Sequence, residues 1–203
     1  MKTILLATHN KGKIKRYRAL FSGLENLRLV TLEELKIDFK AAEPFHTPAE
    51  NSAYKAKEYA KLSLLPTIAI DEAVTTNFLP ENEQPGVFVR RLNKNRELND
   101  AEVLAAWKRI FSLYPSSNRR FIWNFSLSYY DPASDRLETV EATQANTVTE
   151  EFSKIINPGY PMSSFLIPEG FDRPHSELNK EESLLIDRKR LKPFLDFMKN
   201  LTL

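Results

Sequence analysis

The first thirty residues alternate apolar runs with a helical pattern. Residues 3–7 form a continuous apolar run, which predicts a strand buried on both faces. Apolar residues then recur at helical spacing and predict a helix over residues 12–22, and residues 27–31 predict a short second strand. The order strand, turn, helix, strand is typical of the opening of an α/β domain.

A second helix has a clear start signal after a loop over residues 36–46. Thr47 can cap the helix, Pro48 stands at its first position, and Glu50 completes a capping box. These signals predict a helix that runs to about Leu64.

Residues 67–70 form another apolar run, which predicts a buried strand ending at Asp71 and Glu72. The chain is expected to continue extended over residues 74–79 and then to enter a polar loop at residues 80–85.

The second half of the chain predicts a third helix and a hairpin. Asn99 and Glu102 give the same capping signal, and the helix carries its apolar stripe up to Tyr114. Residues 119–130 and 137–149 then predict two long strands of a hairpin.

The C-terminal part predicts a loop over residues 157–164 and helical structure over residues 184–200. Pro193 is expected to end or kink one helical piece.

Composition limits the class of protein. The 203 residues suit one domain, with room for two lobes, and 42% hydrophobic with 28% charged residues is ordinary for a soluble protein. A net charge of +2 gives no reason to expect a nucleic-acid or membrane partner. The chain has no cysteine, no apolar stretch of membrane-spanning length, and an N-terminal apolar run too short for a signal sequence. We therefore expect a cytoplasmic protein.

The turn Thr8-His9-Asn10-Lys11-Gly12-Lys13 is the first candidate for chemistry. It leaves a buried strand and enters a helix, where free backbone N–H groups and the helix dipole favour an anion. Lys13 adds a full charge, and Gly12 allows a phosphate to approach the backbone. The turn lacks the spacing of a P-loop, and an ordinary strand-to-helix turn explains it equally well.

Acidic residues form the second candidate. Carboxylates at the end of a buried strand, as predicted for Asp71, can hold Mg²⁺ against substrate phosphates, and one can activate water. Structural roles are open for each: Glu50 as a capping residue, Glu43 as a solvated loop charge, and Asp71 and Glu72 as partners of Lys55.

Two further segments are candidates for substrate contacts. Asn51 and Lys55 stand four residues apart on one helix face, although helix lysines are usually solvated. Aromatic residues of the loop 158–165 could stack on a base or simply cover the core. The three histidines are dispersed, and the short basic runs, such as residues 119–120 and 188–190, are typical of solvated faces.

Taken together, the order and separation of these segments resemble the inosine/xanthosine triphosphate pyrophosphatases. Four segments carry the resemblance: residues 8–13 (T/S-x-N-x-G-K in the family), 47–56 (T-F-x-E-N-A-x-x-K-A), 69–74 (A-D-D-S-G-L) and 84–91 (A-P-G-V-Y-S-A-R). The resemblance covers nearly the whole chain. It implies Mg²⁺-dependent hydrolysis of deaminated or otherwise non-standard purine nucleoside triphosphates to monophosphate and pyrophosphate.

The resemblance also implies site residues. Asp71 would bind metal and activate water, Lys55 would touch phosphate, and Glu43 would be a metal ligand. The substrate-binding residues would be Thr8, Asn10, Lys13, Asn51, Glu72, Arg91, Tyr160, Arg188 and Lys189.

The sequence departs from the family at several motif positions. Ile70 replaces the first aspartate of the pair, and Glu72 is a candidate to restore the charge. Met162 stands in the loop that lacks the family's aspartate, Ser183 replaces a lysine, and residues 187–189 replace the base-reading S-H-R. The phosphate end is better kept than the base end. An alternative is therefore a catalytically impaired paralogue that binds nucleotide or acts as an interaction protein.

The resemblance implies an elongated mixed α/β fold. A central β-sheet would be flanked by helices, and a nucleotide cleft would lie between two lobes of one domain, residues 1–203. It also implies a homodimer.

Overall fold

A computed structural model describes residues 1–92 and 96–202 of the chain, without the side chain of Thr202. Its six strands form one sheet in the order β2-β1-β3-β4-β5-β6. β1 pairs in parallel with β2 and β3, whereas β5 pairs antiparallel with β6, so the sheet is mixed. The strands are β1 (Lys2–Leu6), β2 (Leu27–Thr31), β3 (Thr67–Thr76), β4 (Arg120–Asp131), β5 (Arg136–Val148) and β6 (Leu166–Pro168). The predicted α/β class with a mixed sheet is confirmed.

The helices of the described part begin and end close to the predicted positions. They are α1 (Lys11–Phe21), α2 (Pro48–Ser63), α3 (Asp100–Leu113), α4 (Lys180–Arg190) and α5 (Lys192–Thr202). Short 3₁₀ turns occur at Glu81–Glu83, Pro161–Ser164 and His175–Glu177.

The chain divides into two compact units. The first contains residues 1–72, 124–143 and the segment from Asp187 onward, and the second contains residues 73–123 and 144–186. β3, β4 and β5 each contribute residues to both units.

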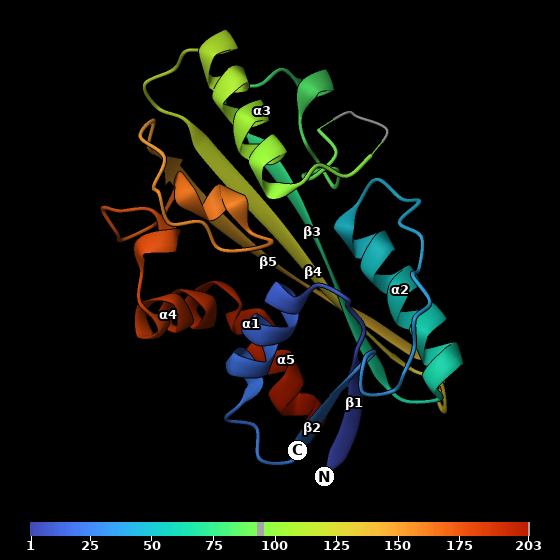
Figure 1. Ribbon diagram of the computed structural model, residues 1–203. Coiled ribbons are helices and arrows are strands. Elements are labelled where there is room, and N and C mark those ends of the chain that lie inside the picture. Colours follow the sequence, from blue (N-terminus) through green and yellow to red (C-terminus); the bar gives the residue numbers. More distant parts are fainter. Residues whose placement is uncertain (93–95, 203) are drawn as a thin grey trace. The chain divides into compact units, whose positions relative to one another are not determined.

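The first unit has helices on both faces of its strands. Figure 1 shows α2 on one side of β1 and the pair α1 and α5 on the other. Leu5, Ala56, Tyr59 and Ala69 belong to one buried cluster, which joins α2 to β1 and β3. On the other side, the rings of Tyr17 and Phe194 lie 6.5 Å apart and join α1 to α5.

The second unit has an aromatic core under α3. The ring centroids of Trp107 and Phe121 are 4.7 Å apart, and those of Phe111 and Phe165 are 5.4 Å apart. The capping box predicted for this helix is confirmed, because Asn99 and Glu102 each bond the other's backbone N–H. At α2 the box is incomplete: Thr47 accepts from the N–H of Glu50, but the Glu50 carboxylate accepts from the Thr47 hydroxyl.

The prediction that a strand ends at Asp71 and Glu72 is wrong. β3 is one strand of ten residues that passes through both carboxylates to Thr76. Charges inside a buried strand require partners. Lys55 supplies one for Asp71, and Lys13 supplies one for Glu72.

The C-terminal helices differ slightly from the prediction. α4 begins at Lys180 rather than at residue 184, because Asn179 and Glu182 form a reciprocal cap there. The chain breaks between α4 and α5, and Pro193 lies in the first turn of α5, as expected for proline. Not every basic residue of the short runs is solvated, since Arg119 and Arg190 are buried.

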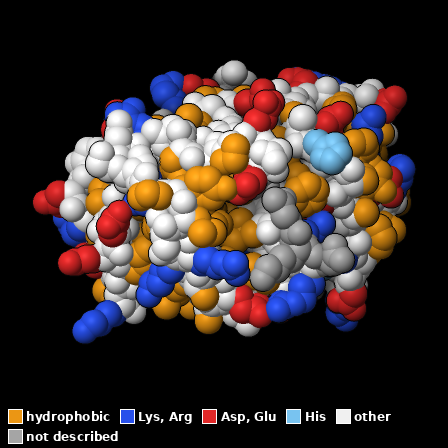
Figure 2. Space-filling view, turned by 90° about the horizontal axis from the view of Figure 1, so that it is seen from above, with side chains coloured by type: hydrophobic (Ala, Val, Ile, Leu, Met, Phe, Trp, Pro, Cys, Tyr) orange, Lys and Arg blue, Asp and Glu red, His pale blue; other side chains and the backbone are white. Residues whose placement is uncertain are grey.

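The surface carries charges of both signs. On the face drawn in Figure 2, acidic and basic side chains are intermixed with apolar ones. Within the described residues, no helix is both long enough and apolar enough to span a bilayer.

Candidate active site

The turn from β1 into α1 is held by its own side chains. The Asn10 side chain is the N-cap of α1 and accepts hydrogen bonds from Gly12 N (2.9 Å) and Lys13 N (3.1 Å). Thr8 Oγ1 accepts from Asn10 N at 3.1 Å. The expectation of free N–H groups at this helix start is therefore wrong for Gly12 and Lys13. The positive charge that the turn presents comes from the Lys13 side chain and the helix dipole.

Strand alternation sends Asp71 and Glu72 to opposite faces of β3. Successive side chains of a strand point to opposite sides of the sheet. Asp71 points toward α2, where it meets Lys55, and Glu72 points toward α1, where it meets Lys13 and Arg16. Ile70 stands two residues before Glu72 and so shares its face.

Lys55 lies at the centre of the α2 side of the site. Its Nζ donates to Asp71 Oδ1 at 2.7 Å, to Glu43 Oε1 at 3.1 Å and to the Ile70 carbonyl at 3.2 Å. The Lys55 and Asp71 side chains are about 10% exposed, whereas that of Glu43 is 39% exposed. Sequence reasoning expected Glu43, Lys55 and Asp71 to act together, and the structure brings these three side chains into contact.

Burial and charge act in opposite directions on this group. Burial lowers the pKa of Lys55, but Asp71 and Glu43 outweigh it and raise that pKa above its usual range, so the ammonium stays charged. Burial raises the pKa of Asp71, and the charges of Lys55 and Lys13 offset this only in part. A carboxylate with a raised pKa beside a lysine is typical of a group that takes a proton.

The carboxylates of Glu43 and Asp71 could bind a hard cation only together with a further ligand. Both place an oxygen next to the Lys55 ammonium, which balances their negative charge in this structure. Oxygen donors suit Mg²⁺, which commonly takes one or two protein carboxylates together with substrate phosphates and water. In residues 1–92 and 96–202 no group of three or more His, Asp or Glu side chains could hold a metal ion alone.

On the α1 side, Glu72 belongs to a charged network that the sequence did not reveal. Its Oε1 lies 3.5 Å from Lys13 Nζ and 3.6 Å from Arg16 Nη1. Arg16 Nε lies 3.8 Å from Asp187 Oδ1, which in turn lies 2.5 Å from Arg190 Nη2. Burial raises the pKa of Glu72, but Lys13, Arg16 and Arg190 lower it to a net value below the usual range. Arg16 follows Lys13 by three residues, a spacing that places both on one helix face and was the available signal.

Asn51 has a structural partner in this structure. Its side chain is fully buried, accepts from Phe45 N and donates to Phe45 O, both at 3.0 Å. Both polar atoms of the amide therefore hold the loop before α2. Asn51 therefore contacts the loop before α2, whereas Lys55 contacts Glu43 and Asp71.

Arg91 and Tyr160 belong to the second unit. Arg91 lies in a turn with its guanidinium 5.6 Å from the Phe88 ring centroid. Tyr160 packs near Trp123 and His175, with ring centroids 5.8 and 6.0 Å away. Met162, in the loop that lacks the family's aspartate, is 3% exposed and is part of the core.

The last predicted residues lie on α4. Arg188 and Lys189 are exposed, and Ser183 lies in the first turns of the helix. Asp187, the first residue of the segment that resembles S-H-R, is buried and paired with Arg16 and Arg190. Its carboxylate is therefore engaged within the protein.

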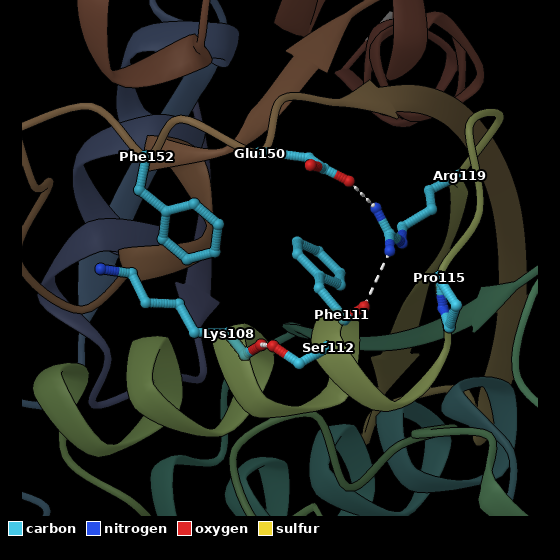
Figure 3. A pocket seen from close by; sticks show the side chains of 7 residues that line it. All are labelled: Lys108, Phe111, Ser112, Pro115, Arg119, Glu150 and Phe152. Atoms are coloured by element: carbon cyan, nitrogen blue, oxygen red, sulfur yellow. Dashed lines mark hydrogen bonds and ion pairs between the residues drawn. The ribbon is translucent and has the colours of Figure 1, made fainter.

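A separate pocket of about 400 Å³ lies within the second unit (Figure 3) and contains none of the predicted site residues. Its buried Arg119 donates to the carbonyls of Phe111 and Tyr114 at the end of α3 and to the exposed carboxylate of Glu150. The guanidinium also lies 4.7 Å from the Phe111 ring centroid. These contacts identify Arg119 as a helix-capping residue.

Comparison with known proteins identifies relatives along nearly the whole chain. A family model described as the Ham1 family matches residues 4–192. A dITP/XTP pyrophosphatase of Leptospira interrogans is 27% identical over 198 residues, which are 97% of this chain and 96% of that protein. The dITP/XTP pyrophosphatase of Escherichia coli K12 is 28% identical over 203 residues, with 98% and 100% coverage.

Solved structures share the fold. A HAM1 protein from Coxiella burnetii superposes with a TM-score of 0.78 at 22% identity, covering 99% of this chain and 98% of that one. The Ham1 protein of Staphylococcus aureus gives a TM-score of 0.73 at 18% identity, with 98% and 97% coverage.

Proposed function

The chain belongs to the Ham1 family, and from this premise we propose that it hydrolyses non-standard purine nucleoside triphosphates to nucleoside monophosphates and pyrophosphate. Two kinds of support meet in this proposal. The two dITP/XTP pyrophosphatases named above match this chain over 96% and 100% of their own length. The chain's own first unit also assembles the groups that such a reaction needs.

The observation that carries the proposal is the convergence of Glu43 and Asp71 on Lys55, with Lys13 close enough to influence Asp71. Phosphoryl transfer depends mainly on positioning and on electrostatic stabilisation of phosphate oxygens. Two lysines and two carboxylates on neighbouring elements provide both charge signs for that task. The contacts among Glu43, Lys55 and Asp71 within one compact unit support this assignment of the phosphate end.

In the proposed reaction, Asp71 receives the proton of the attacking water. The water oxygen forms a bond to the α-phosphorus, the bond from that phosphorus to the bridging oxygen of the β-phosphate breaks, and pyrophosphate leaves with the electron pair. Lys13 faces the triphosphate at the start of α1, and Lys55 holds Asp71 in place and offsets negative charge on the phosphates. Burial of Asp71 raises its pKa and makes the carboxylate a better base than an exposed aspartate.

We propose Mg²⁺ as the cofactor, held by Glu43 and Asp71 together with phosphate and water oxygens. When bound, the ion supplies neutralisation of the charge on the phosphate oxygens. The remaining expectations rest on the resemblance to the family: a homodimer, a cytoplasmic location, and substrate contacts from Thr8, Asn10, Arg91, Tyr160, Arg188 and Lys189.

A nucleotide panel tests the proposed function. The purified chain is incubated with XTP, ITP, dITP, GTP, ATP and dATP in Mg²⁺, and pyrophosphate is measured, with EDTA as the metal-free control. We expect release of pyrophosphate from the deaminated nucleotides, and water labelled with ¹⁸O should place the label in the monophosphate. Nucleotide binding without any turnover would favour the impaired paralogue instead.

A further inference from the structure

Five charged side chains of the first unit form a row of alternating sign. The row runs from Lys13 through Glu72, Arg16 and Asp187 to Arg190, with successive separations of 3.5, 3.6, 3.8 and 2.5 Å. Each of these side chains is at most 18% exposed. The row connects the lysine of the phosphate-binding turn with the C-terminal end of α4.

Glu72 is shared between two cations. Its Oε1 is almost equally far from Lys13 Nζ and Arg16 Nη1, and among the described residues that oxygen has no hydrogen-bond partner. A buried carboxylate oxygen shared in this way is held by the charges of both partners. Any phosphate that binds Lys13 meets this carboxylate as a competitor.

Arg16 is fixed in a position where it can hold Glu72. Asp187 lies on its other side, and Arg190 in turn pairs with Asp187 while its guanidinium lies 5.2 Å from the Phe125 ring centroid. Because Arg16 has a carboxylate on each side, it is anchored independently of any ligand.

We propose that Glu72 is an internal anion that competes with substrate phosphate for Lys13, and that Arg16 is the positioning residue that limits this competition by sharing Glu72. The inference rests on the proposed function, because it assumes that Lys13 binds the phosphate chain. It assigns to Arg16 a control over phosphate affinity that acts through Glu72 rather than by contact with substrate.

Two other roles for these residues predict different behaviour. If Arg16 itself bound phosphate, its loss would weaken binding whether or not Glu72 is charged. If Glu72 were a metal ligand that replaces the charge missing at Ile70, its neutralisation would weaken Mg²⁺-dependent turnover and would not strengthen metal-free phosphate binding. A double-mutant cycle between the two residues separates these cases.

The test measures binding of inorganic tripolyphosphate in EDTA by calorimetry, using the full chain. Glu72→Gln is expected to tighten binding about fivefold, or roughly 1 kcal/mol, because Lys13 then no longer pairs with a carboxylate. Arg16→Gln is expected to weaken binding about fivefold when Glu72 is present, because Glu72 then loses its other cation within 4 Å and pairs more strongly with Lys13. In the Glu72→Gln background the same Arg16→Gln change should alter binding by less than about twofold.

Controls separate positioning from general charge and from folding. Lys15→Gln removes one positive charge from an exposed position beside Arg16 and should leave tripolyphosphate binding nearly unchanged. Arg16→Lys should restore most of the affinity that Arg16→Gln loses. Asp187 keeps its contact with Arg190 in the Arg16→Gln variant, and thermal unfolding checks that each variant is folded.

The outcomes also separate this inference from the proposed function. The inference is overturned if Arg16→Gln weakens binding equally in both backgrounds, or if Glu72→Gln fails to tighten it. If Arg16 and Glu72 are coupled in tripolyphosphate binding but the chain turns over no nucleotide, the inference is supported and the proposed reaction is rejected. For turnover, the inference expects Arg16→Gln to raise KM with little change in kcat, since the lost interaction concerns binding.

Discussion

Removal of the Lys55 ammonium should destabilise the first unit through the carboxylate that it leaves behind. In Lys55→Met, Asp71 loses its 2.7 Å partner while its side chain remains only 9% exposed. Breaking a buried ion pair by removing one member typically reduces the free energy of unfolding by about 3–5 kcal/mol. We expect about 3 kcal/mol here, because Lys13 remains near enough to stabilise the Asp71 carboxylate in part.

Asp71→Asn supplies the second half of a double-mutant cycle. With the aspartate neutral, Lys55→Met no longer leaves a buried charge on β3, so the double variant should be more stable than the sum of the single changes by about 2 kcal/mol. Urea unfolding at pH 8, followed by circular dichroism and tryptophan fluorescence, measures these differences if both probes give one transition. Lys61→Met on the same helix is the matched control, since its pair with Glu58 is exposed and its loss should have no measurable effect.

The reasoning would be refuted if Lys55→Met cost less than about 1 kcal/mol, or if the two changes were additive. Either result would mean that Asp71 and Lys55 are not energetically coupled, and Lys55 would then not be the group that offsets the cost of burying the Asp71 carboxylate.

Two further predictions concern the ends of helices. Asn10→Ala removes the N-cap of α1 and should lower the free energy of unfolding by about 1 kcal/mol in urea, whereas Asn10→Asp should retain the cap; equal stability of all three proteins would contradict the assignment. Partial burial raises the pKa of Asp100, but its hydrogen bonds with Arg90 and Gly159 outweigh this and lower the pKa below its usual range. The Asp100 carboxylate therefore stabilises the folded protein above its unfolded-state pKa, and this stabilisation is lost as the pH falls. The difference in free energy of unfolding between wild type and Asp100→Asn should therefore shrink from about pH 5 to pH 3. A difference that stays constant over this range would contradict the lowered pKa.

Local signals in the sequence account for most of the fold. The capping residues Asn99 and Thr47 and the apolar runs of β1 and β3 are short-range features, and the helices and strands that they predict are present. The strand was predicted to end at Asp71 and Glu72 because two adjacent charges seldom lie within a buried strand, yet β3 continues through both. Their partners Lys55 and Lys13 lie 16 and 59 residues away in sequence, and such pairing leaves no local periodicity.

The sequence likewise indicated some residues of the candidate site and not others. Lys13, Lys55 and Asp71 were candidates because the order of the motifs places them on α1, α2 and β3. The row from Glu72 to Arg190 could not be predicted, because it joins α1, β3 and α4 through side chains that lie far apart in the sequence. Met162 offered a weak signal, since methionine is among the residue types most often buried, and it is buried.

The most direct test of the central claim is the rate of pyrophosphate release from XTP by the wild-type chain and by Asp71→Asn, in saturating Mg²⁺ at pH 8. The account predicts turnover by the wild type and a loss of about 10²–10⁴-fold in kcat for the variant, because proton transfer to a positioned base contributes on that order. A folded Asp71→Asn variant that turns over XTP at the wild-type rate would contradict the claim that Asp71 takes the proton of the attacking water.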